Sequence, residues 1–485
     1  MLFNSIPFAV FFLITLGLYY AIPQRFRWWM LLAASYFFYA FWKLDFIFLL
    51  LGSTLVNYLL GRRMAMFAEK QDRKIHLWLG VSFNIGILFL FKYVNFFSQS
   101  LTSLFHALGL SCDMPLFHLL LPVGISFYCF QSLGYIVDVY HGRIQAERHL
   151  GIFALFVSFW PQLLAGPINR ASLLMPQFRQ THTFDYQRVT DGLRLMLWGL
   201  VKKVALADQL AIYVNRVFNH VGDHQGIALI LAIVFYTIQI YCDFSGYTDM
   251  ARGGARVLGY EFMENFRHPY FSRSLREFWQ RWHISLSTWF RDYLYIPLGG
   301  NRAAPWRWHF NLFITFVLSG LWHGANWTFV IWGTIHGGVL VLENATRHFQ
   351  ERVADRIFPG KASRWNHALQ TGITMVIVSF AWLFFRADSV GDAFNIIGRM
   401  GDLGGFWAKG LGTGVVGPCR FLLLVAGIAV LFWVEYKEQK AGTRIHEQVG
   451  KLCPIVRWTL YTLSFWAVFL LTVFGIKQEF IYFQF

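Results

Sequence analysis

The stretch Phe8–Tyr20 reads FAVFFLITLGLYY and contains neither a charged residue nor an alternation of polar and apolar positions. A second stretch, Phe421–Val434, reads FLLLVAGIAVLFWV and has the same character. A membrane-crossing helix needs about 20 mostly apolar residues, whereas the strands of a transmembrane β-barrel alternate in polarity. These stretches therefore predict an all-α membrane protein and exclude a β-barrel.

The composition of the whole chain agrees with this prediction. Of the 485 residues, 56% are hydrophobic and 14% are charged, against roughly 25% charged in soluble proteins. The mean hydropathy is +0.44. Aromatic residues make up 19% of the chain, which suits wide membrane–water interfaces. Soluble, disordered and collagen-like classes are excluded, because so few charges cannot build a water-exposed surface.

The charge balance is strongly basic, with 42 Lys and Arg against 26 Asp and Glu and a formal net charge of +16. No basic patch forms a soluble module, so nucleic-acid binding is not expected. The basic residues gather after every second predicted span, which places those loops in the cytoplasm and both termini outside. The cysteines are scattered without metal-ligand spacing and are interpreted as apolar filler: Cys112, Cys129, Cys242, Cys419 and Cys453.

The apolar runs predict about 11–12 transmembrane helices within one integral-membrane domain, residues 1–485, with no cleavable signal at its start. The segment 151–166 is also apolar, but Pro161 and Pro167 interrupt it, and it is interpreted as a re-entrant hairpin. The predicted spans are 5–22, 28–42, 45–60, 76–92, 116–138, 190–215, 226–244, 309–322, 325–342, 367–385, 417–435 and 458–476.

The region from Ser245 to His309 is too polar to cross the membrane and too aromatic for a solvated loop. Within it, apolar residues from Leu275 to Tyr293 recur at helical spacing, which predicts one amphipathic helix that lies at the membrane interface or packs under the helix bundle. The opposite, polar face of that helix is formed by Arg276, Gln280, His283, Ser287 and Arg291.

Two histidines stand out, because ionisable groups in a membrane bundle are costly. His323 lies between two apolar spans, with Gly320 and Gly324 beside it, and glycine permits the close approach of a backbone or a substrate. The alternative is a helix-end histidine bonded to a carbonyl. His283 is either functional or an interfacial polar residue. His336 cannot share a face with His323 if the segment between them is one continuous helix.

Two further polar groups are compatible with purely structural roles. Asp243, Ser245 and Asp249 form a cluster that is interpreted mainly as capping at a helix break. Arg291 and Asp292 precede a predicted helix stop at Pro297. No serine-hydrolase, phosphate-loop or dinucleotide motif is present in a fitting context. A metal site is not predicted, because no third ligand accompanies the two histidines.

Three motifs are specific. They are YCDFSGYTDM at 241–250, EFWQRWHISLSTWFRDYLY at 277–295 and GLWHGANW at 320–327. Together they closely resemble the membrane-bound O-acyltransferase family, in its bacterial polysaccharide branch, which includes the membrane subunit of alginate O-acetylation. LPVGISF at 121–127, LAGP at 164–167 and the aromatic tail FIYFQF at 480–485 look like further landmarks of this branch.

The resemblance implies a ring-like helical core around a central tunnel. It also implies an essential histidine, His323, in the Trp-His-Gly motif, with His283 as the second catalytic residue. His323 is expected to accept the proton of an attacking hydroxyl, or to carry the acyl group covalently, while His283 orients substrate or stabilises the oxyanion. The remaining motif positions are expected to support the tunnel: Asp243, Arg276, Arg281, Ser287, Arg291, Asp292 and Asn326.

The expected function is therefore acetyl transfer from a cytoplasmic thioester, such as acetyl-CoA, toward an alginate-like exopolysaccharide or a periplasmic partner protein. No bound cofactor is expected. The protein is expected in the bacterial inner membrane, in contact with lipids, acetyl-transfer partners and a polysaccharide synthesis complex. The same core could instead acylate teichoic acid with D-alanine, or modify cellulose or peptidoglycan. A transporter or flippase is an alternative from another class, and a scaffold for a synthase is a third.

Overall fold

The computed structural model describes residues 1–485 except 165, 358–363, 402–412, 473–479 and 484–485. The described residues form helices and turns, with no strand among them, so the predicted all-α class is confirmed. Two of the expected landmarks fall partly outside the described residues, namely the Leu164–Pro167 motif at Ala165 and the last two residues of the aromatic tail.

Five of the described helices are long and apolar enough to cross a membrane, which confirms a multi-pass protein. The other predicted spans coincide with shorter or less apolar helices. The predicted span 76–92 ends too early, because the helix continues through η1 and α5 as far as Ala107. The five long helices are Lys70–Ala107, Ile227–Leu258, Arg364–Arg386, Pro418–Ala441 and Pro454–Leu471.

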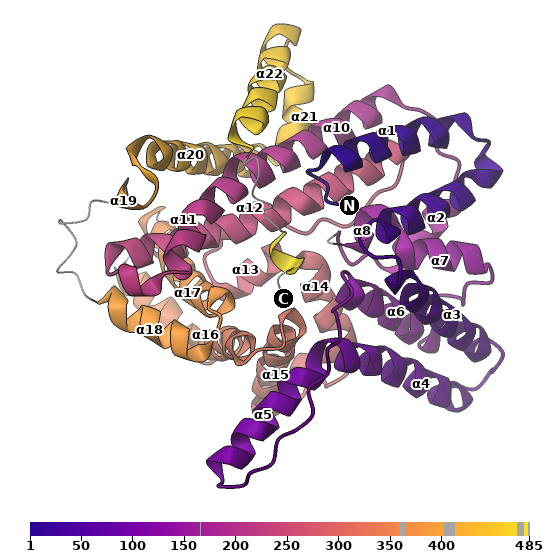
Figure 1. Ribbon diagram of the computed structural model, residues 1–485, viewed down its shortest axis with the longest axis horizontal. Helices are drawn as coiled ribbons and strands as arrows, with labels where there is room; N and C mark the ends of the chain where they lie inside the picture. Colours follow the sequence, from indigo (N-terminus) through magenta and orange to yellow (C-terminus); the bar gives the residue numbers. More distant parts are fainter. Residues whose placement is uncertain (165, 358–363, 402–412, 473–479, 484–485) are drawn as a thin grey trace. The chain divides into compact units, whose positions relative to one another are not determined.

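The described chain divides into two compact units. The first unit comprises residues 1–196 and 250–263. Within it, α3 packs against α4, α6 and α7, and α2 packs against α7 (Figure 1). The helices that begin in this unit are α1 (Ile6–Ala21), α2 (Gln24–Ala40), α3 (Phe46–Met64), α4 (Lys70–Leu88), η1 (Phe89–Tyr93), α5 (Val94–Ala107), α6 (Ile125–Tyr140), α7 (Leu150–Ser158), α8 (Trp160–Leu163), α9 (Ala171–Leu174), η2 (Met175–Arg179) and α10 (Tyr186–Leu200).

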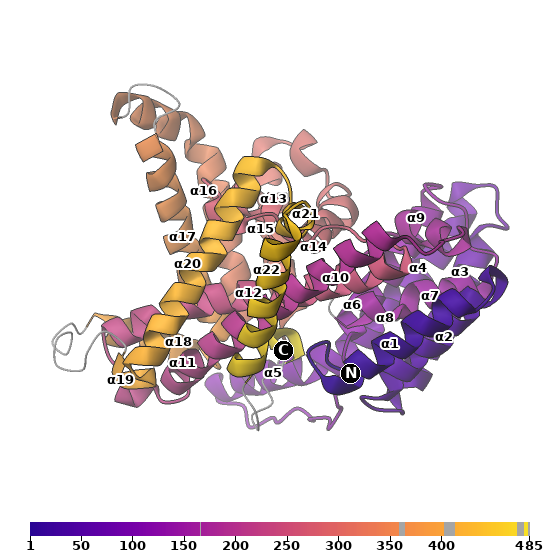
Figure 2. The same ribbon diagram turned by 90° about the horizontal axis from the view of Figure 1, so that it is seen from above.

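The second unit comprises residues 197–249 and 264–485. Its α15 and α16 run side by side, and α16 also packs against α17 (Figure 2). The helices that begin in it are η3 (Val201–Ala207), α11 (Asp208–Phe218), η4 (Val221–Asp223), α12 (Ile227–Leu258), η5 (Pro269–Phe271), α13 (Leu275–Arg281), α14 (Ile284–Phe290), η6 (Arg291–Tyr295), η7 (Gly300–Arg302), α15 (Pro305–His323), α16 (Trp327–Ile357), α17 (Arg364–Arg386), α18 (Val390–Met400), α19 (Thr413–Val416), α20 (Pro418–Ala441), α21 (Ile445–Gly450), α22 (Pro454–Leu471) and η9 (Ile481–Phe483). The prediction of a single integral domain stays a prediction.

The segment predicted as a re-entrant hairpin forms two short helices, α7 and α8, which are interrupted at Phe159. Every residue from Ile152 to Leu164 is buried. Irregular backbone at membrane depth is tolerated where protein shields it, so this burial fits the interrupted helix.

The predicted helix break at Asp243 and Ser245 is wrong, because α12 continues without interruption from Ile227 to Leu258. Asp243 therefore does not cap a helix end. The irregularity lies in the preceding predicted span instead, where the π-helical segment η3 separates α10 from α11. Lys202 and Lys203 lie in η3 and are buried, and each has a carboxylate partner on α11 or α12.

The single amphipathic helix predicted between Leu275 and Tyr293 is also wrong, because it is broken into α13 and α14 at Trp282 and His283. His283 adopts a left-handed conformation with φ of 44°, which cannot continue a right-handed helix. The backbone N–H of Ile284 donates instead to the carbonyl oxygen of Asn265, at 3.0 Å. His283 consequently leaves the predicted polar face and is fully buried. The apolar stripe from Leu275 to Trp289 is buried as predicted.

Candidate active site

His323 is the last residue of α15, and Gly324 ends this helix in an extended conformation. At this end α15 and α16 approach each other closely. A Cβ added at Gly320 would lie 2.2 Å from the carbonyl oxygen of Phe329, and one at Gly324 would lie 2.1 Å from the Phe329 ring. The two glycines therefore admit the neighbouring helix, a packing typical of small residues between membrane helices.

The imidazole of His323 is only 4% exposed and is enclosed by aromatic rings. Its ring centroid lies 5.1 Å from that of Trp332, 5.3 Å from that of Phe385 and 5.6 Å from that of Tyr482. Its position at the helix end also matters, because the negative end of a helix dipole stabilises a protonated histidine. The surroundings of His323 are therefore largely apolar, and the end of the α15 dipole is the feature of this enclosure that would stabilise a transient positive charge on the ring.

His283 lies beside His323, with ring centroids 6.4 Å apart. The Nδ1 atom of His283 is 3.3 Å from the Oδ1 atom of Asn265, which also accepts hydrogen bonds from the backbone and hydroxyl of Ser285. Because an amide oxygen only accepts, Nδ1 carries the proton and Nε2 of the neutral ring is the acceptor. Within the described residues, the buried Nε2 atom has no hydrogen-bond partner.

The protonation state of His283 follows from its burial. His283 lies outside the five membrane-spanning helices, and burial lowers its pKa to about 3, because the cation loses its hydration. The ring is therefore neutral at physiological pH and a weak base. An acceptor nitrogen on a neutral ring suits the positioning of a hydroxyl better than the donation of a proton to an oxyanion.

The C-terminal tail places a third residue with a polar group, Tyr482, beside the two histidines. Figure 1 shows η9 as a short turn of the second unit, and the ring of Tyr482 lies 4.3 Å from Phe244 and 6.2 Å from His283, by centroids. The tail is attached through Asp243, whose Oδ2 accepts a hydrogen bond of 2.8 Å from the N–H of Ile481. The other oxygen of Asp243 lies 2.6 Å from Nζ of Lys203. The sequence marked this tail as a landmark, but not its place beside the histidines.

The predicted supporting residues fall into two groups. Those of the first group make hydrogen bonds at the helix ends around the site. Arg281 donates to Glu277 at 2.5 Å, and the hydroxyl of Ser287 donates to the Trp282 carbonyl at the helix break. Asn326 caps α16 by accepting a hydrogen bond from the N–H of Thr328 at 3.0 Å.

The second group is exposed or half-buried and pairs elsewhere. Arg276 is exposed and donates to the side chain of Asn344. Arg291 pairs with its neighbour Asp292 at 2.8 Å. The structure thus brings together His283, His323 and Asp243 with the tail, and it gives Arg276, Arg291 and Asp292 other partners.

His336 was excluded from the face of His323 on the assumption of one continuous helix, but α15 and α16 are separate helices. The Trp332 ring contacts both histidines, at 5.1 Å from His323 and 4.8 Å from His336. His336 is fully buried and packs between Trp279 and Trp332. Sequence reasoning missed this arrangement, because a turn between two apolar helices leaves little local signal.

No group of three or more histidine, cysteine or acidic side chains suited to a metal occurs among the described residues. The site's chemistry is therefore argued from imidazole, carboxylate and aromatic groups. A neutral histidine near a second, helix-terminal histidine in a dry enclosure can orient a hydroxyl and remove its proton.

Comparison with known proteins identifies the enzyme class. Residues 148–385 match the model of MBOAT, the membrane-bound O-acyltransferase family. The chain is 44% identical over 407 residues to the probable alginate O-acetylase AlgI of Pseudomonas putida. The aligned region covers 83% of this chain and 81% of the relative. The chain is 43% identical to the protein of the same name from Pseudomonas aeruginosa, over 83% of this chain and 75% of the relative. It is 34% identical to the peptidoglycan O-acetyltransferase of Helicobacter pylori, over 84% and 80%.

The matched family region contains both buried histidines and ends at Phe385, whose ring contacts His323. The transporter and scaffold alternatives are set aside, because the relatives are acyltransferases along most of their length. With its membrane-spanning helices, the chain is a multi-pass membrane protein, and the inner membrane fits its bacterial alginate O-acetylase relatives. It belongs to the membrane-bound O-acyltransferase family and is an O-acyltransferase.

Proposed function

We propose that this enzyme moves an acetyl group from a cytoplasmic thioester to a hydroxyl of an alginate-like exopolysaccharide, or of a periplasmic protein that serves it. The observation that carries this proposal is the buried pair of His283 and His323, 6.4 Å apart by ring centroids, in a chain with alginate O-acetylase relatives. The identity to the peptidoglycan enzyme is lower, which favours alginate as the model for the acceptor.

The transfer step assigns different roles to the two histidines. Another donor group of the acceptor, such as a neighbouring hydroxyl, gives a hydrogen bond to Nε2 of His283 and so orients the acceptor, while the attacking hydroxyl points its single proton at His323. An imidazole nitrogen of His323 takes the hydroxyl proton as the oxygen forms a bond to the thioester carbonyl carbon. The carbon–sulfur bond then breaks, and the leaving thiolate takes the proton back from His323. Positioned proton transfer of this kind contributes about 10²–10⁴-fold to the rate.

The aromatic enclosure supports this assignment by excluding water. Trp332 and Phe385 pack against the His323 ring, and His323 itself is almost fully buried. A dry site disfavours hydrolysis of the thioester, which would waste the donor. It also strengthens the interaction between an imidazolium and the C-terminal end of α15.

The donor is proposed to be acetyl-CoA or another acetyl thioester, because these are made in the cytoplasm. Arg276 is a candidate contact for donor phosphates. It is exposed, and its guanidinium binds a neutral amide, Asn344, instead of a carboxylate. The carboxylate of Glu343 interacts with the charge of Arg276 but accepts its hydrogen bonds from backbone N–H groups, so the exposed guanidinium can still meet an anion. Acetyl-transfer proteins and a polysaccharide synthesis complex are proposed as partners on the other side of the membrane.

The experiment follows acetyl transfer by purified enzyme in liposomes that contain radiolabelled acetyl-CoA and an alginate oligomer with the periplasmic partner proteins. His323→Ala is expected to lower transfer by about 10²–10⁴-fold at normal expression. His309→Ala, on the same helix α15, is the matched control and is expected to retain activity.

Transfer near the wild-type rate by a well-expressed His323→Ala enzyme would contradict the catalytic assignment. Transfer from a carrier-protein thioester, but not from acetyl-CoA, would overturn the choice of donor and leave the roles of the histidines standing.

A further inference from the structure

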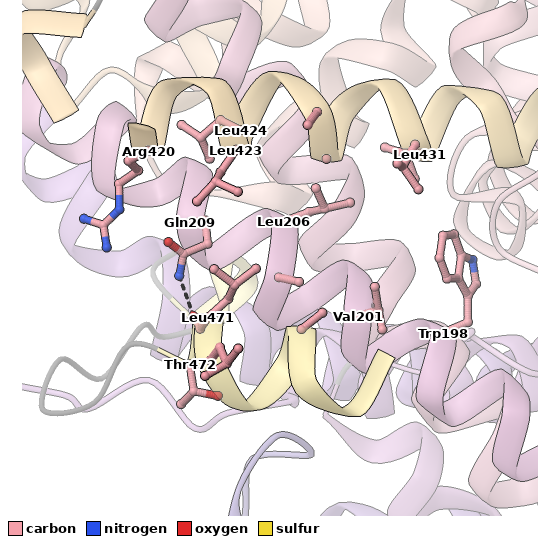
Figure 3. A pocket seen from close by; sticks show the side chains of 16 residues that line it. Trp198, Val201, Leu206, Gln209, Arg420, Leu423, Leu424, Leu431, Leu471 and Thr472 are labelled. Carbon is pink, nitrogen blue, oxygen red and sulfur yellow. Dashed lines mark hydrogen bonds between the residues drawn. The ribbon is translucent and has the colours of Figure 1, made fainter. Parts of the chain in front are cut away.

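The second unit contains a cavity whose lining does not include the two histidines and is mostly apolar. It has a volume of about 590 Å³ and is lined by residues of η3, α11, α20 and α22 (Figure 3). This volume lies within the range of about 300–1,000 Å³ typical of small-molecule sites. None of its lining residues belongs to the catalytic arrangement, so the proposed acetyl transfer leaves the cavity without a role.

The lining is divided between an apolar body and a polar end. Apolar side chains such as Leu206, Leu424 and Leu431 line the body. Gln209, Arg420 and Thr472 gather at one end, and Trp198 lies at the other end (Figure 3). Such a lining matches an amphipathic molecule with a long apolar part and one polar head.

Arg420 determines the charge of the head that fits. It is exposed and lies in the first turn of α20, where free backbone N–H groups add positive potential. Among the described residues it has neither a hydrogen bond nor a carboxylate partner. An arginine without a protein partner on a membrane helix favours an anion, and its planar donor fork matches phosphate.

The helix α22 shows why an apolar chain would occupy the cavity. None of its residues is buried, and it packs mainly against η3. Opposite it, Gly427 of α20 brings the backbone so near to Leu206 that an added Cβ would lie 2.6 Å from that side chain. The space between α20 and α22 is therefore flanked by lipid-facing surface and is not filled by protein side chains.

We propose that this cavity binds an anionic phospholipid, with one acyl chain between α20 and α22 and the phosphate at Arg420. An anionic headgroup is favoured because its attraction to the unpaired arginine is stronger than that of a zwitterionic headgroup. The bound lipid fills the gap beside α22 and holds this helix against η3.

The proposal is tested by native mass spectrometry of the full-length protein in detergent, titrated with phosphatidylglycerol or with phosphatidylcholine of the same chains. Wild-type protein is expected to bind phosphatidylglycerol about tenfold more tightly, as one charge-assisted interaction predicts. Arg420→Gln is expected to remove this preference. Lys437→Gln, at the other end of α20, is the matched control and is expected to keep it.

A second variant tests the acyl-chain part independently of the charge. Ala467→Phe places a ring in the cavity, because Ala467 lines it, and is expected to weaken the binding of both lipids. Leu463→Phe, on the exposed side of the same helix, is expected to leave binding unchanged. Equal affinity for the two lipids, the binding of detergent alone, or an Arg420→Gln protein that keeps its preference would each overturn the proposal. None of these readouts depends on acetyl transfer.

Discussion

Two buried histidines of the second unit share a rare backbone conformation and differ in what their rings meet. His268 and His283 have φ values of 48° and 44°, and no other non-glycine residue of the described chain has a positive φ. The Nε2 atom of His268 lies 2.6 Å from Oε2 of Glu438, which also pairs with Arg444. The Nε2 atom of His283, in contrast, has no hydrogen-bond partner among the described residues and lies beside His323.

The left-handed backbone is expected to serve stability at His268 and the proposed reaction at His283. A left-handed conformation costs a non-glycine residue about 1–3 kcal/mol and persists only where its surroundings enforce it. At His268 the contact of 2.6 Å with Glu438 offsets part of this cost. The Nε2 atom of His283 has no such partner among the described residues, and its ring lies 6.4 Å from that of His323, the proposed base. We therefore expect the same backbone feature to serve folding at His268 and the proposed transfer at His283.

Asparagine variants of the two histidines are expected to lose different properties, one activity and the other stability. Asparagine tolerates left-handed backbone, so His283→Asn and His268→Asn each remove the ring and keep the turn. His283→Asn is expected to lower acetyl transfer by about 10²-fold, the lower end of the range for a positioned group, with little change in melting temperature. The measurements are transfer rate and thermal unfolding of the purified proteins.

The matched variant, His268→Asn, is expected to do the opposite. It leaves Glu438 with fewer partners and should reduce stability by about 1–3 kcal/mol, while transfer per folded molecule stays within about threefold. The distinction between the two histidines fails if both variants lose activity equally or if both merely unfold more easily.

A pH dependence is the next largest effect. The folded-state pKa of His283 is about 3, below an unfolded value of about 6.5, so the unfolded state binds more protons between these values. The contribution of His283 to stability is therefore complete above pH 6.5 and is lost as the pH falls toward 3. Between pH 6.5 and pH 5 this amounts to about 2 kcal/mol.

Thermal unfolding at several pH values measures this dependence. His283→Asn is expected to show a shallower loss of stability below pH 6.5 than the wild type, because asparagine does not titrate. Parallel curves for the two proteins would show that His283 is not buried as a neutral ring.

The sequence predicted helix positions well, because a run of apolar residues is a local property and the membrane demands it. The long helices α12, α17, α20 and α22 lie where apolar runs predicted spans. The break at His283 could not be predicted in this way, because the apolar stripe continues through it. The break depends on Asn265, which accepts hydrogen bonds from Ile284 and Ser285, 19 and 20 residues later in the chain.

The same limit applies to the candidate site. The Trp-His-Gly motif indicated His323, and the resemblance indicated His283, which the structure places beside it. The attachment of the tail could not be predicted, because Asp243 and Ile481 are 238 positions apart. Asp243 was interpreted as a cap, since a carboxylate in an apolar helix has no visible partner in sequence. Its partner, Lys203, lies in another predicted span.

Two arginines close in sequence to the two histidines are expected to differ modestly in their effect on the KM for the donor. Arg267 adjoins His268 and pairs with Glu264 at 2.8 Å, a carboxylate that also binds Arg444. Arg276 lies on α13, the helix that ends just before His283, and its guanidinium donates to the neutral side chain of Asn344. If donor phosphates approach on this side, Arg276→Gln should raise the KM for the donor about tenfold, because one charge-assisted hydrogen bond is lost.

Arg267→Gln is the matched control and removes a charge of the same sign from the same region. Its guanidinium is already paired with Glu264, so the KM for the donor should stay within about twofold. Initial-rate kinetics with varied acetyl-CoA, at fixed acceptor, measure both variants. If both raise KM equally, the donor responds to net charge alone. If neither does, these arginines only set the orientation of the chain in the membrane, which depends on the sum of many basic residues and tolerates the loss of one.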